Sequence, residues 1–112
     1  MCGIVGFINC GDQEQLSAAV REVEHRGPDG IGVEWFNERN SGLGHARLAI
    51  IDLSDNGRQP MFDPETGNWL IFNGEIYNYK LLREELSKFG HSFKTGTDTE
   101  VVLASFHKWG EA

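Results

Sequence analysis

Apolar residues in the first quarter of the chain predict a strand followed by a helix. Residues 2–8 form an apolar run broken by glycines, which is typical of a short buried strand. Residues 9–12 (Asn-Cys-Gly-Asp) favour a turn. A helix is predicted over 13–25, ended by Gly27-Pro28, because its apolar residues recur at helical spacing: Leu16, Ala19, Val20 and Val23.

The middle of the chain predicts strands separated by polar loops. A strand is expected around 32–36, and residues 37–42 are typical of a hairpin loop. Residues 43–51 predict either two strands or one long, bent strand. Residues 54–67 are rich in Asp, Asn, Gly and Pro and are expected to form a loop, whereas the apolar run 69–72 predicts a compact strand.

The last third of the chain predicts two helices. Asn78 is placed to cap a helix that Gly90 ends, with an apolar face made of Tyr79, Leu82, Leu86 and Phe89. Residues 91–94 predict a brief strand. Thr97 and Glu100 have capping-box spacing, and they open a last helix expected to bury Val102, Leu103, Phe106 and Trp109.

Composition narrows the class of protein. Helices and strands alternate without the regular rhythm of a parallel sheet, which favours an α+β fold. The 112 residues, 39% of them hydrophobic, suffice for one domain or part of one. A net charge of −7 without a basic cluster argues against binding to nucleic acid or an anionic membrane. No apolar run spans a membrane, no secretory signal is visible and two cysteines make no disulfide framework, so a cytoplasmic location is expected.

The second residue, Cys2, is the first candidate for chemistry. Removal of Met1 would leave Cys2 with its thiol and a free α-amine on the same Cα. An α-amine has a pKa of about 7.7–8.0, so it can act as a general base for the thiol near neutral pH. A plain buried cysteine is the alternative interpretation of this position taken alone.

Four later motifs change that balance. Cys2-Gly3-Ile4-Val5-Gly6 is followed, in order, by His25-Arg26-Gly27-Pro28-Asp29-Gly30, Arg47-Leu48-Ala49-Ile50-Ile51-Asp52, Asn73-Gly74-Glu75-Ile76-Tyr77-Asn78 and Gly96-Thr97-Asp98-Thr99-Glu100. In order and spacing, over all 112 residues, the chain resembles the glutaminase domain of glutamine-hydrolysing asparagine synthetases, a branch of the class II glutamine amidotransferases. Leu48 after the pocket arginine favours this branch over the sugar-phosphate branch, which tends to have Trp or Tyr there.

The resemblance implies a role for each motif. Cys2 would attack the side-chain amide of glutamine, form a thioester and release ammonia, and water would then free glutamate. The side chain of Asn73 and the backbone N–H of Gly74 would stabilise the oxyanion. Arg47 would hold the α-carboxylate, and Asp98, with Glu75 nearby, the α-ammonium group. Backbone groups would line the same pocket at Leu48, Ala49, Ile50 and Ile51.

Each motif alone has a simpler structural interpretation. Asn73-Gly74 is an ordinary turn sequence, Asp98 suits a helix start, and Arg47 could pair with a neighbouring acid. The joint pattern outweighs these three alternatives. The 25–30 run is expected to be structural, Cys10 to be a buried small hydrophobe, and the remaining histidines (His45, His91 and His107) to bind no metal.

The resemblance also implies a larger whole. The family's glutaminase domain is an αββα Ntn-hydrolase sandwich of two antiparallel sheets, and residues 1–112 would form its N-terminal portion, incomplete in this chain. No Ser-Gly-Gly-x-Asp-Ser pyrophosphate loop occurs, so the synthetase domain, with its ATP and Mg²⁺, is expected to be absent from this chain. The implied partners are glutamine and a synthetase domain in cis, and a homodimer is compatible with the resemblance. The alternatives are a related amidotransferase with a different nitrogen acceptor, or an inactive truncated fragment.

Overall fold

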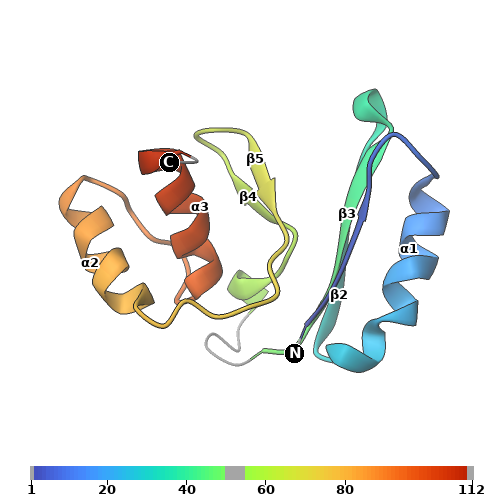
Figure 1. Ribbon diagram of the computed structural model, residues 1–112, viewed down its shortest axis with the longest axis horizontal. Coiled ribbons are helices and arrows are strands. Elements are labelled where there is room, and N and C mark those ends of the chain that lie inside the picture. Colours follow the sequence, from blue (N-terminus) through green and yellow to red (C-terminus); the bar gives the residue numbers. More distant parts are fainter. Residues whose placement is uncertain (1, 50–54, 111–112) are drawn as a thin grey trace.

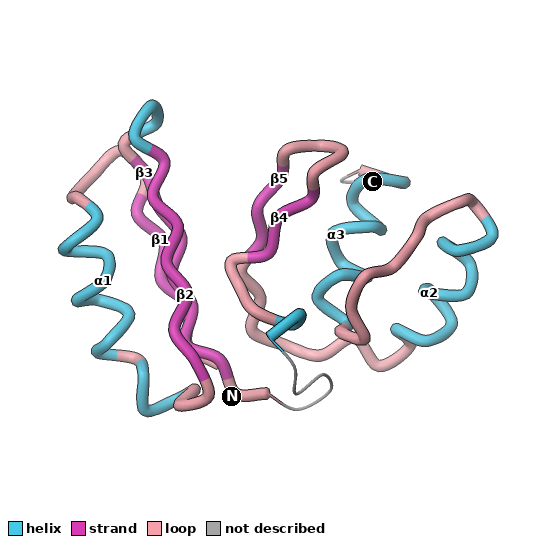
Figure 2. The backbone as a smooth tube through the Cα atoms, turned by 180° about the vertical axis from the view of Figure 1, so that it is seen from behind, coloured by secondary structure: helices cyan, strands magenta, loops and turns pink. Residues whose placement is uncertain are grey.

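The computed structural model describes residues 2–49 and 55–110, which form two α+β halves. Figure 1 shows a three-stranded sheet with α1 on its outer side, and across from it a β-hairpin backed by two helices. The same arrangement is visible from behind in Figure 2. The mixed helices and antiparallel strands confirm the α+β class.

The first sheet places the start of the chain beside the end of its central strand. Its strands are β1 (Gly3–Phe7), β2 (Gly30–Phe36) and β3 (Ser41–Arg47), in the order β1-β3-β2 and all antiparallel. The β1–β3 register pairs Gly3 with Ala46, so Cys2 lies next to the residues that follow Ala46. Between β2 and β3 the chain turns through a short 3₁₀ helix, Asn37–Arg39, and Asn40 in a left-handed conformation.

Helix α1 (Gln13–Glu22) covers the outer face of this sheet. Asp12 caps it by accepting the Gln15 backbone N–H at 2.8 Å, and Leu16 and Val20 are fully buried against the strands. A Cβ at Gly44 would collide with Val20, so this glycine lets the helix approach β3 closely. The α-helix ends at Glu22 and a 3₁₀ turn, Glu24–Arg26, completes the helical stretch predicted over 13–25.

The second half begins with a hairpin where the sequence predicted only a loop. After a 3₁₀ turn at Asp55–Gly57, strand β4 (Met61–Asp63) pairs with β5 (Asn68–Leu70). The prediction of loop throughout 54–67 was therefore wrong for β4. Turn-forming residues dominate that segment's composition, and they do form the turn: Asp63 accepts the backbone N–H of Glu65 and the hydroxyl of Thr66.

Helices α2 (Tyr79–Lys88) and α3 (Asp98–Trp109) pack on each other behind the hairpin. Leu86, Val101 and Ala104 form their buried core. Some predicted details were wrong: the Asn78 side chain makes no capping hydrogen bond, Phe89 is 60% exposed, and 91–94 is not a strand. Phe89 lies at the end of α2. The Lys108 Nζ lies over its ring, 4.1 Å from the ring centroid.

The start of α3 was predicted correctly, but of the four residues expected to be buried only Leu103 is. Thr97 accepts the Glu100 N–H, whereas the Glu100 carboxylate accepts from Lys94 and Thr95, outside the capping-box pattern. Val101, Leu103 and Ala104 are buried, Val102 is only partly buried, and Phe106 and Trp109 are 46% and 40% exposed. Packing against α2 thus selects a different face of the helix from the one marked by its largest side chains.

Across the described residues, none of the helices combines the length and the apolar character that crossing a membrane requires.

Candidate functional site

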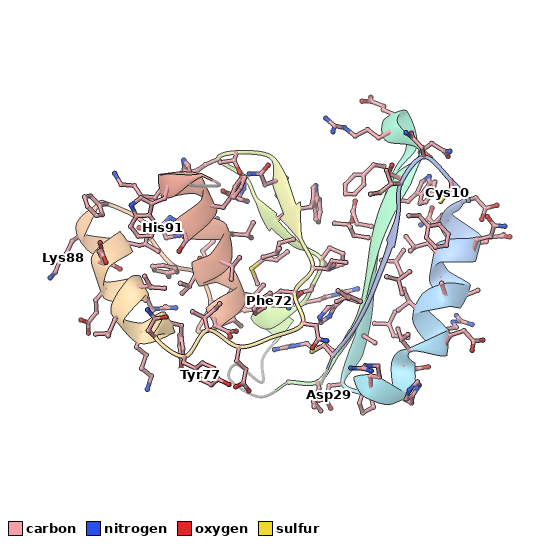
Figure 3. All side chains as sticks on the ribbon, viewed as in Figure 1. Cys10, Asp29, Phe72, Tyr77, Lys88 and His91 are labelled. Atoms are coloured by element: carbon pink, nitrogen blue, oxygen red, sulfur yellow. The ribbon has the colours of Figure 1, made fainter. Side chains whose placement is uncertain are left out.

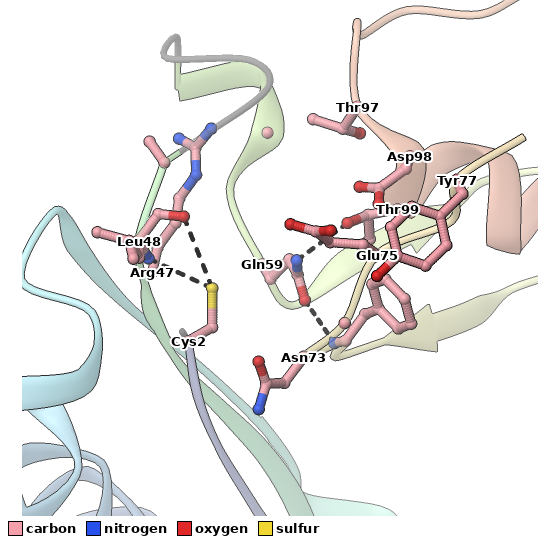
Figure 4. Close-up of a pocket in the computed structure, with 14 residues that line it drawn as sticks. Cys2, Arg47, Leu48, Gln59, Asn73, Glu75, Tyr77, Thr97, Asp98 and Thr99 are labelled. Carbon is pink, nitrogen blue, oxygen red and sulfur yellow. Dashed lines mark hydrogen bonds between the residues drawn. The ribbon is translucent and has the colours of Figure 1, made fainter. Parts of the chain in front are cut away.

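A pocket of about 450 Å³ lies between the two halves of the molecule. It is lined by eight of the residues that the sequence nominated: Cys2, Arg47, Leu48, Ala49, Asn73, Gly74, Glu75 and Asp98. Figure 4 shows Cys2, Arg47 and Leu48 on one side of it and Asn73, Glu75 and Asp98 on the other. The other two nominated residues, Ile50 and Ile51, lie outside the described residues.

Cys2 is held by the strand beside it. The Leu48 backbone N–H donates to the Cys2 Sγ at 3.3 Å, and the thiol faces the Leu48 carbonyl oxygen at 3.7 Å. Arg26 Nε donates to the Cys2 carbonyl oxygen at 3.3 Å. The sulfur is therefore held at the pocket wall by Leu48, the residue that follows β3, with its backbone N–H directed at the sulfur.

Part of the 25–30 run supports the same wall. The backbone N–H of Asp29 donates to the Arg47 carbonyl oxygen, and the Asp29 carboxylate accepts the Ala49 N–H, both at 2.8 Å. Gly27 lies so close to the Ala46 carbonyl that a Cβ would clash with it. These contacts fit the predicted structural role, and they extend it, because the run holds both ends of the Arg47–Ala49 segment.

Arg47 ends β3 and reaches a glycine that the sequence analysis did not single out. A Cβ on Gly57 would lie within contact distance of the Arg47 guanidinium and about as close to the Thr97 methyl group. Gly57 is buried, so the space that its missing side chain leaves is part of the cationic side of the pocket. The size of residue 57 therefore sets where the guanidinium can lie.

We expect Gly57→Ala to displace the Arg47 guanidinium and to raise KM for a carboxylate-bearing substrate about tenfold, because small misplacements of a binding group weaken it strongly. Steady-state kinetics would measure the change. Gly6→Ala is the matched control, since a Cβ there meets nothing within 4 Å. Equal KM values for the two variants would contradict this role of Gly57.

The acidic side of the pocket comes from α3 and the loop before α2. Asp98 is the first residue of α3 and only 7% exposed, and its carboxylate accepts the Ile76 backbone N–H at 3.0 Å. Thr97 makes the capping hydrogen bond, and Asp98 lies in the first turn of α3, where a carboxylate suits the helix start in addition to facing the pocket. Glu75 is exposed at the edge of the pocket. The site thus sets a cation opposite two carboxylates (Figure 4).

Asn73 and Gly74 lie in the segment between β5 and α2. They directly follow Phe72, and all three residues line the pocket. Figure 3 shows the Phe72 segment in the centre of the molecule, between the two halves. A Cβ on Gly74 would approach the Phe72 ring at 3.1 Å, tighter than most such contacts. The glycine therefore leaves room for the Phe72 ring beside it, and it is itself exposed in the pocket lining.

His45 is fully buried behind the pocket, on β3. Burial lowers the pKa of its ring below 6.5, the nearby Arg47 charge lowers it further, and the contact with the Phe72 carbonyl opposes these effects. The ring is therefore neutral at pH 7 in the folded protein.

This lowered pKa predicts a pH-dependent stability. Above pH 6.5 the ring is neutral in both states, whereas below it the unfolded chain binds the proton first, so acid lowers the free energy of unfolding. The slope from this group is at most about 1.4 kcal/mol per pH unit. We expect wild type to lose more stability than His45→Gln between pH 7 and pH 5 in urea titrations. Parallel pH profiles for the two proteins would contradict the assignment.

Sequence reasoning missed six residues of the pocket: Gly57, Gln59, Phe72, Tyr77, Thr97 and Thr99. Tyr77, Thr97 and Thr99 lie within the quoted motifs and Phe72 directly precedes Asn73, so their position in the sequence was the available signal. Gln59 gave no such signal. The prediction for Cys10 was wrong: it is exposed, in the turn between β1 and α1 (Figure 3), where the chain has already left the core. Within the described ranges, no three His, Cys, Asp or Glu side chains are grouped as a metal site.

Comparisons with known proteins identify the family of this chain. The chain is 45% identical to asparagine synthetase [glutamine-hydrolyzing] 1 of Bacillus subtilis over 99% of its own length, and 42% identical to the putative asparagine synthetase [glutamine-hydrolyzing] 2 of Methanocaldococcus jannaschii over 98%. It is also 37% identical, over 98% of its length, to the amidase chry2 of Gibberella zeae. It covers 18%, 24% and 18% of these relatives, about a fifth of their length. Residues 1–112 match the glutamine amidotransferase domain family throughout, and the chain belongs to that family.

Proposed function

We propose that this chain hydrolyses the side-chain amide of glutamine through a thioester on Cys2. The observation that carries the proposal is the convergence, in one pocket, of the Cys2 thiol, the Arg47 cation, the Asp98 carboxylate and the Asn73-Gly74 pair. Two halves of the chain supply these groups, so the arrangement is a property of the fold and not of one motif.

The chemistry follows from what each group can do. With Met1 removed, the α-amine of Cys2 accepts the thiol proton, and the Sγ attacks the amide carbon to form a tetrahedral oxyanion. When the carbon–nitrogen bond breaks, the ammonium at Cys2 returns the proton to the leaving nitrogen and ammonia departs. Water then adds to the thioester, the carbon–sulfur bond breaks, and glutamate and the thiol are released.

Stabilisation of the oxyanion is assigned to Asn73 and Gly74. An amide N–H₂ and a backbone N–H are the usual donors for such an oxygen, and they act most strongly in a pocket that limits water. The Leu48 N–H, which is directed at the sulfur at 3.3 Å, holds the nucleophile at the pocket wall.

The free amino acid is recognised by its two charges. The forked guanidinium of Arg47 suits the α-carboxylate, and Asp98, with Glu75 at the edge, suits the α-ammonium group. This pairing explains selection of free glutamine over a glutamine side chain within a protein. The backbone of Leu48 and Ala49, which lines the pocket, extends the same binding surface.

The wider setting is proposed from the family. The two described halves support an αββα Ntn-hydrolase sandwich of which this chain forms the N-terminal part. In relatives named as glutamine-hydrolysing asparagine synthetases, further chain would use the ammonia with ATP and Mg²⁺ and aspartate as acceptor. The second candidate is a glutamine amidotransferase with a different nitrogen acceptor. The similarity to a protein named as an amidase favours this candidate.

Labelling with a diazoketone analogue of glutamine tests the proposal. Intact mass first establishes that Met1 has been removed from the full-length protein. Peptide mapping should then place the label on Cys2, glutamine should protect it, and ammonia release should stop in proportion to labelling. Label on Cys10 alone, or on neither cysteine, would refute the proposal.

A further inference from the structure

The backbone of Phe72 is held from both sides by buried side chains. Its N–H donates to Gln59 Oε1 at 2.6 Å, and its carbonyl oxygen lies 3.3 Å from His45 Nε2. His45 is 0% exposed and Gln59 6% exposed. Because buried hydrogen bonds are costly to break, these two contacts fix both polar groups of one residue. The residue they fix immediately precedes Asn73-Gly74.

Both side chains are themselves anchored to the elements that carry the other functional groups. His45 lies on β3, two residues before Arg47, and pairs with Ile4 of β1. The second polar atom of Gln59, Nε2, donates to Thr99 Oγ1 at 3.2 Å, next to Asp98 in α3. The segment between β5 and α2 is therefore tied to the strand of Arg47 and to the helix of Asp98.

The backbone of Gln59 is also fixed against the first sheet. A Cβ on Gly32 of β2 would overlap the Gln59 carbonyl oxygen, so only glycine permits this approach. Gly32 pairs directly with His45 in the sheet register. His45 and the backbone of Gln59 are therefore held at paired positions of the same sheet.

The chemistry of the contact defines the ring's hydrogen. A carbonyl oxygen only accepts, so the proton must be on Nε2, and Nδ1 has no partner among the described residues. The lowered pKa of the ring is consistent with this neutral form. The Nε2–H of His45 is therefore directed at the Phe72 carbonyl oxygen.

We propose that His45 and Gln59 are positioning residues that hold the Phe72 peptide groups so that Asn73 and Gly74 point at the developing oxyanion. This inference rests on the proposed function, because it assumes that those two residues are the oxyanion donors. His45 does not line the pocket, and the side-chain amide of Gln59, which does, is engaged by Phe72 and Thr99, so each acts on Asn73-Gly74 through Phe72. A misaligned donor reduces the stabilisation of the transition state more than it reduces substrate binding. We therefore expect kcat to fall while KM changes little.

Two substitutions at residue 45 give a matched test in the full-length protein. The amide nitrogen of His45→Gln occupies roughly the place of Nε2 and can still donate to Phe72, whereas the shorter His45→Asn places its nitrogen near Nδ1. We expect His45→Asn to lower kcat about tenfold to a hundredfold with KM for glutamine nearly unchanged. His45→Gln is expected to recover most of that loss.

Two substitutions at Gln59 give an independent test, which does not depend on whether the variants at residue 45 fold. Gln59→Glu keeps an acceptor for the Phe72 N–H, and Gln59→Met removes it. We expect the methionine variant to lose more in kcat than the glutamate variant. Amide hydrogen exchange supplies a readout apart from activity: the Phe72 N–H should be protected in wild type and in Gln59→Glu, and should exchange faster in Gln59→Met.

The outcomes separate the inference from the proposed function. Unlabelled Cys2 in wild type would refute the function and the inference with it. Normal labelling and turnover in wild type, with equal kcat in both variants of each pair or with losses that fall on KM, would overturn the positioning role alone. Losses in kcat that only follow the unfolded fraction in thermal melts would also overturn it, in favour of a structural role.

Discussion

Cys2→Ser is expected to lower glutaminase kcat by about 10³-fold or more, because a hydroxyl at the chain start is a far poorer nucleophile than the thiolate and the thioester cannot form. Ammonia release from glutamine measures this. Substrate affinity should persist, since Arg47 and Asp98 remain in the pocket. Glutamine binding measured by calorimetry should therefore change little.

Cys10→Ser is the matched control for that variant. Cys10 is exposed in the turn after β1, so its replacement should leave kcat within about twofold of wild type. A glutaminase that keeps its activity in Cys2→Ser, or that loses it in Cys10→Ser, would contradict the assignment of the nucleophile.

Asn73→Ala is expected to lower kcat on the order of 10²–10³-fold with KM nearly unchanged, because one preorganised oxyanion donor is removed while ground-state binding remains. Asn78→Ala is the matched amide control, since the exposed Asn78 makes no capping bond and should leave kcat near wild type. An increase in KM without loss of kcat would instead make Asn73 a ground-state binding residue.

Local patterns predicted the first half of the fold well. The glycine-broken run at 2–8 and the helical spacing of Leu16 and Val20 correspond to β1 and α1, and the two helix residues are fully buried as their spacing indicates. The strand was wrongly predicted to be buried, because Ile4 in β1 and Ile8 just after it are 47% and 82% exposed. Strand β4 could not be predicted in this way. It is three residues long, and it exists because β5 pairs with it, which is a non-local contact.

The buried face of α3 illustrates the same limit. Its largest apolar residues, Phe106 and Trp109, suggested the core, yet Val101 and Ala104 pack against Leu86 of α2. Which stripe of a helix is buried depends on where the neighbouring helix crosses it. That crossing is not encoded in the spacing of α3 alone.

For the candidate site, the motifs identified the residues that carry charge or reactivity, and the structure places eight of them around one pocket. What they could not identify are the supports. Gln59 lies in a segment dominated by turn residues, and Gly57 matters only because the Arg47 guanidinium occupies the space beside it. Such roles arise from packing between distant segments.

The most direct test of the account is to trap the acyl-enzyme. The full-length protein, with Met1 removed, is mixed with isotope-labelled glutamine, quenched in acid during turnover and mapped by mass spectrometry. The account predicts a labelled glutamyl group in thioester linkage on the N-terminal Cys2, absent in Cys2→Ser and released by hydroxylamine. Steady ammonia release with no acyl group on Cys2, under conditions where hydrolysis of the intermediate limits the rate, would contradict it.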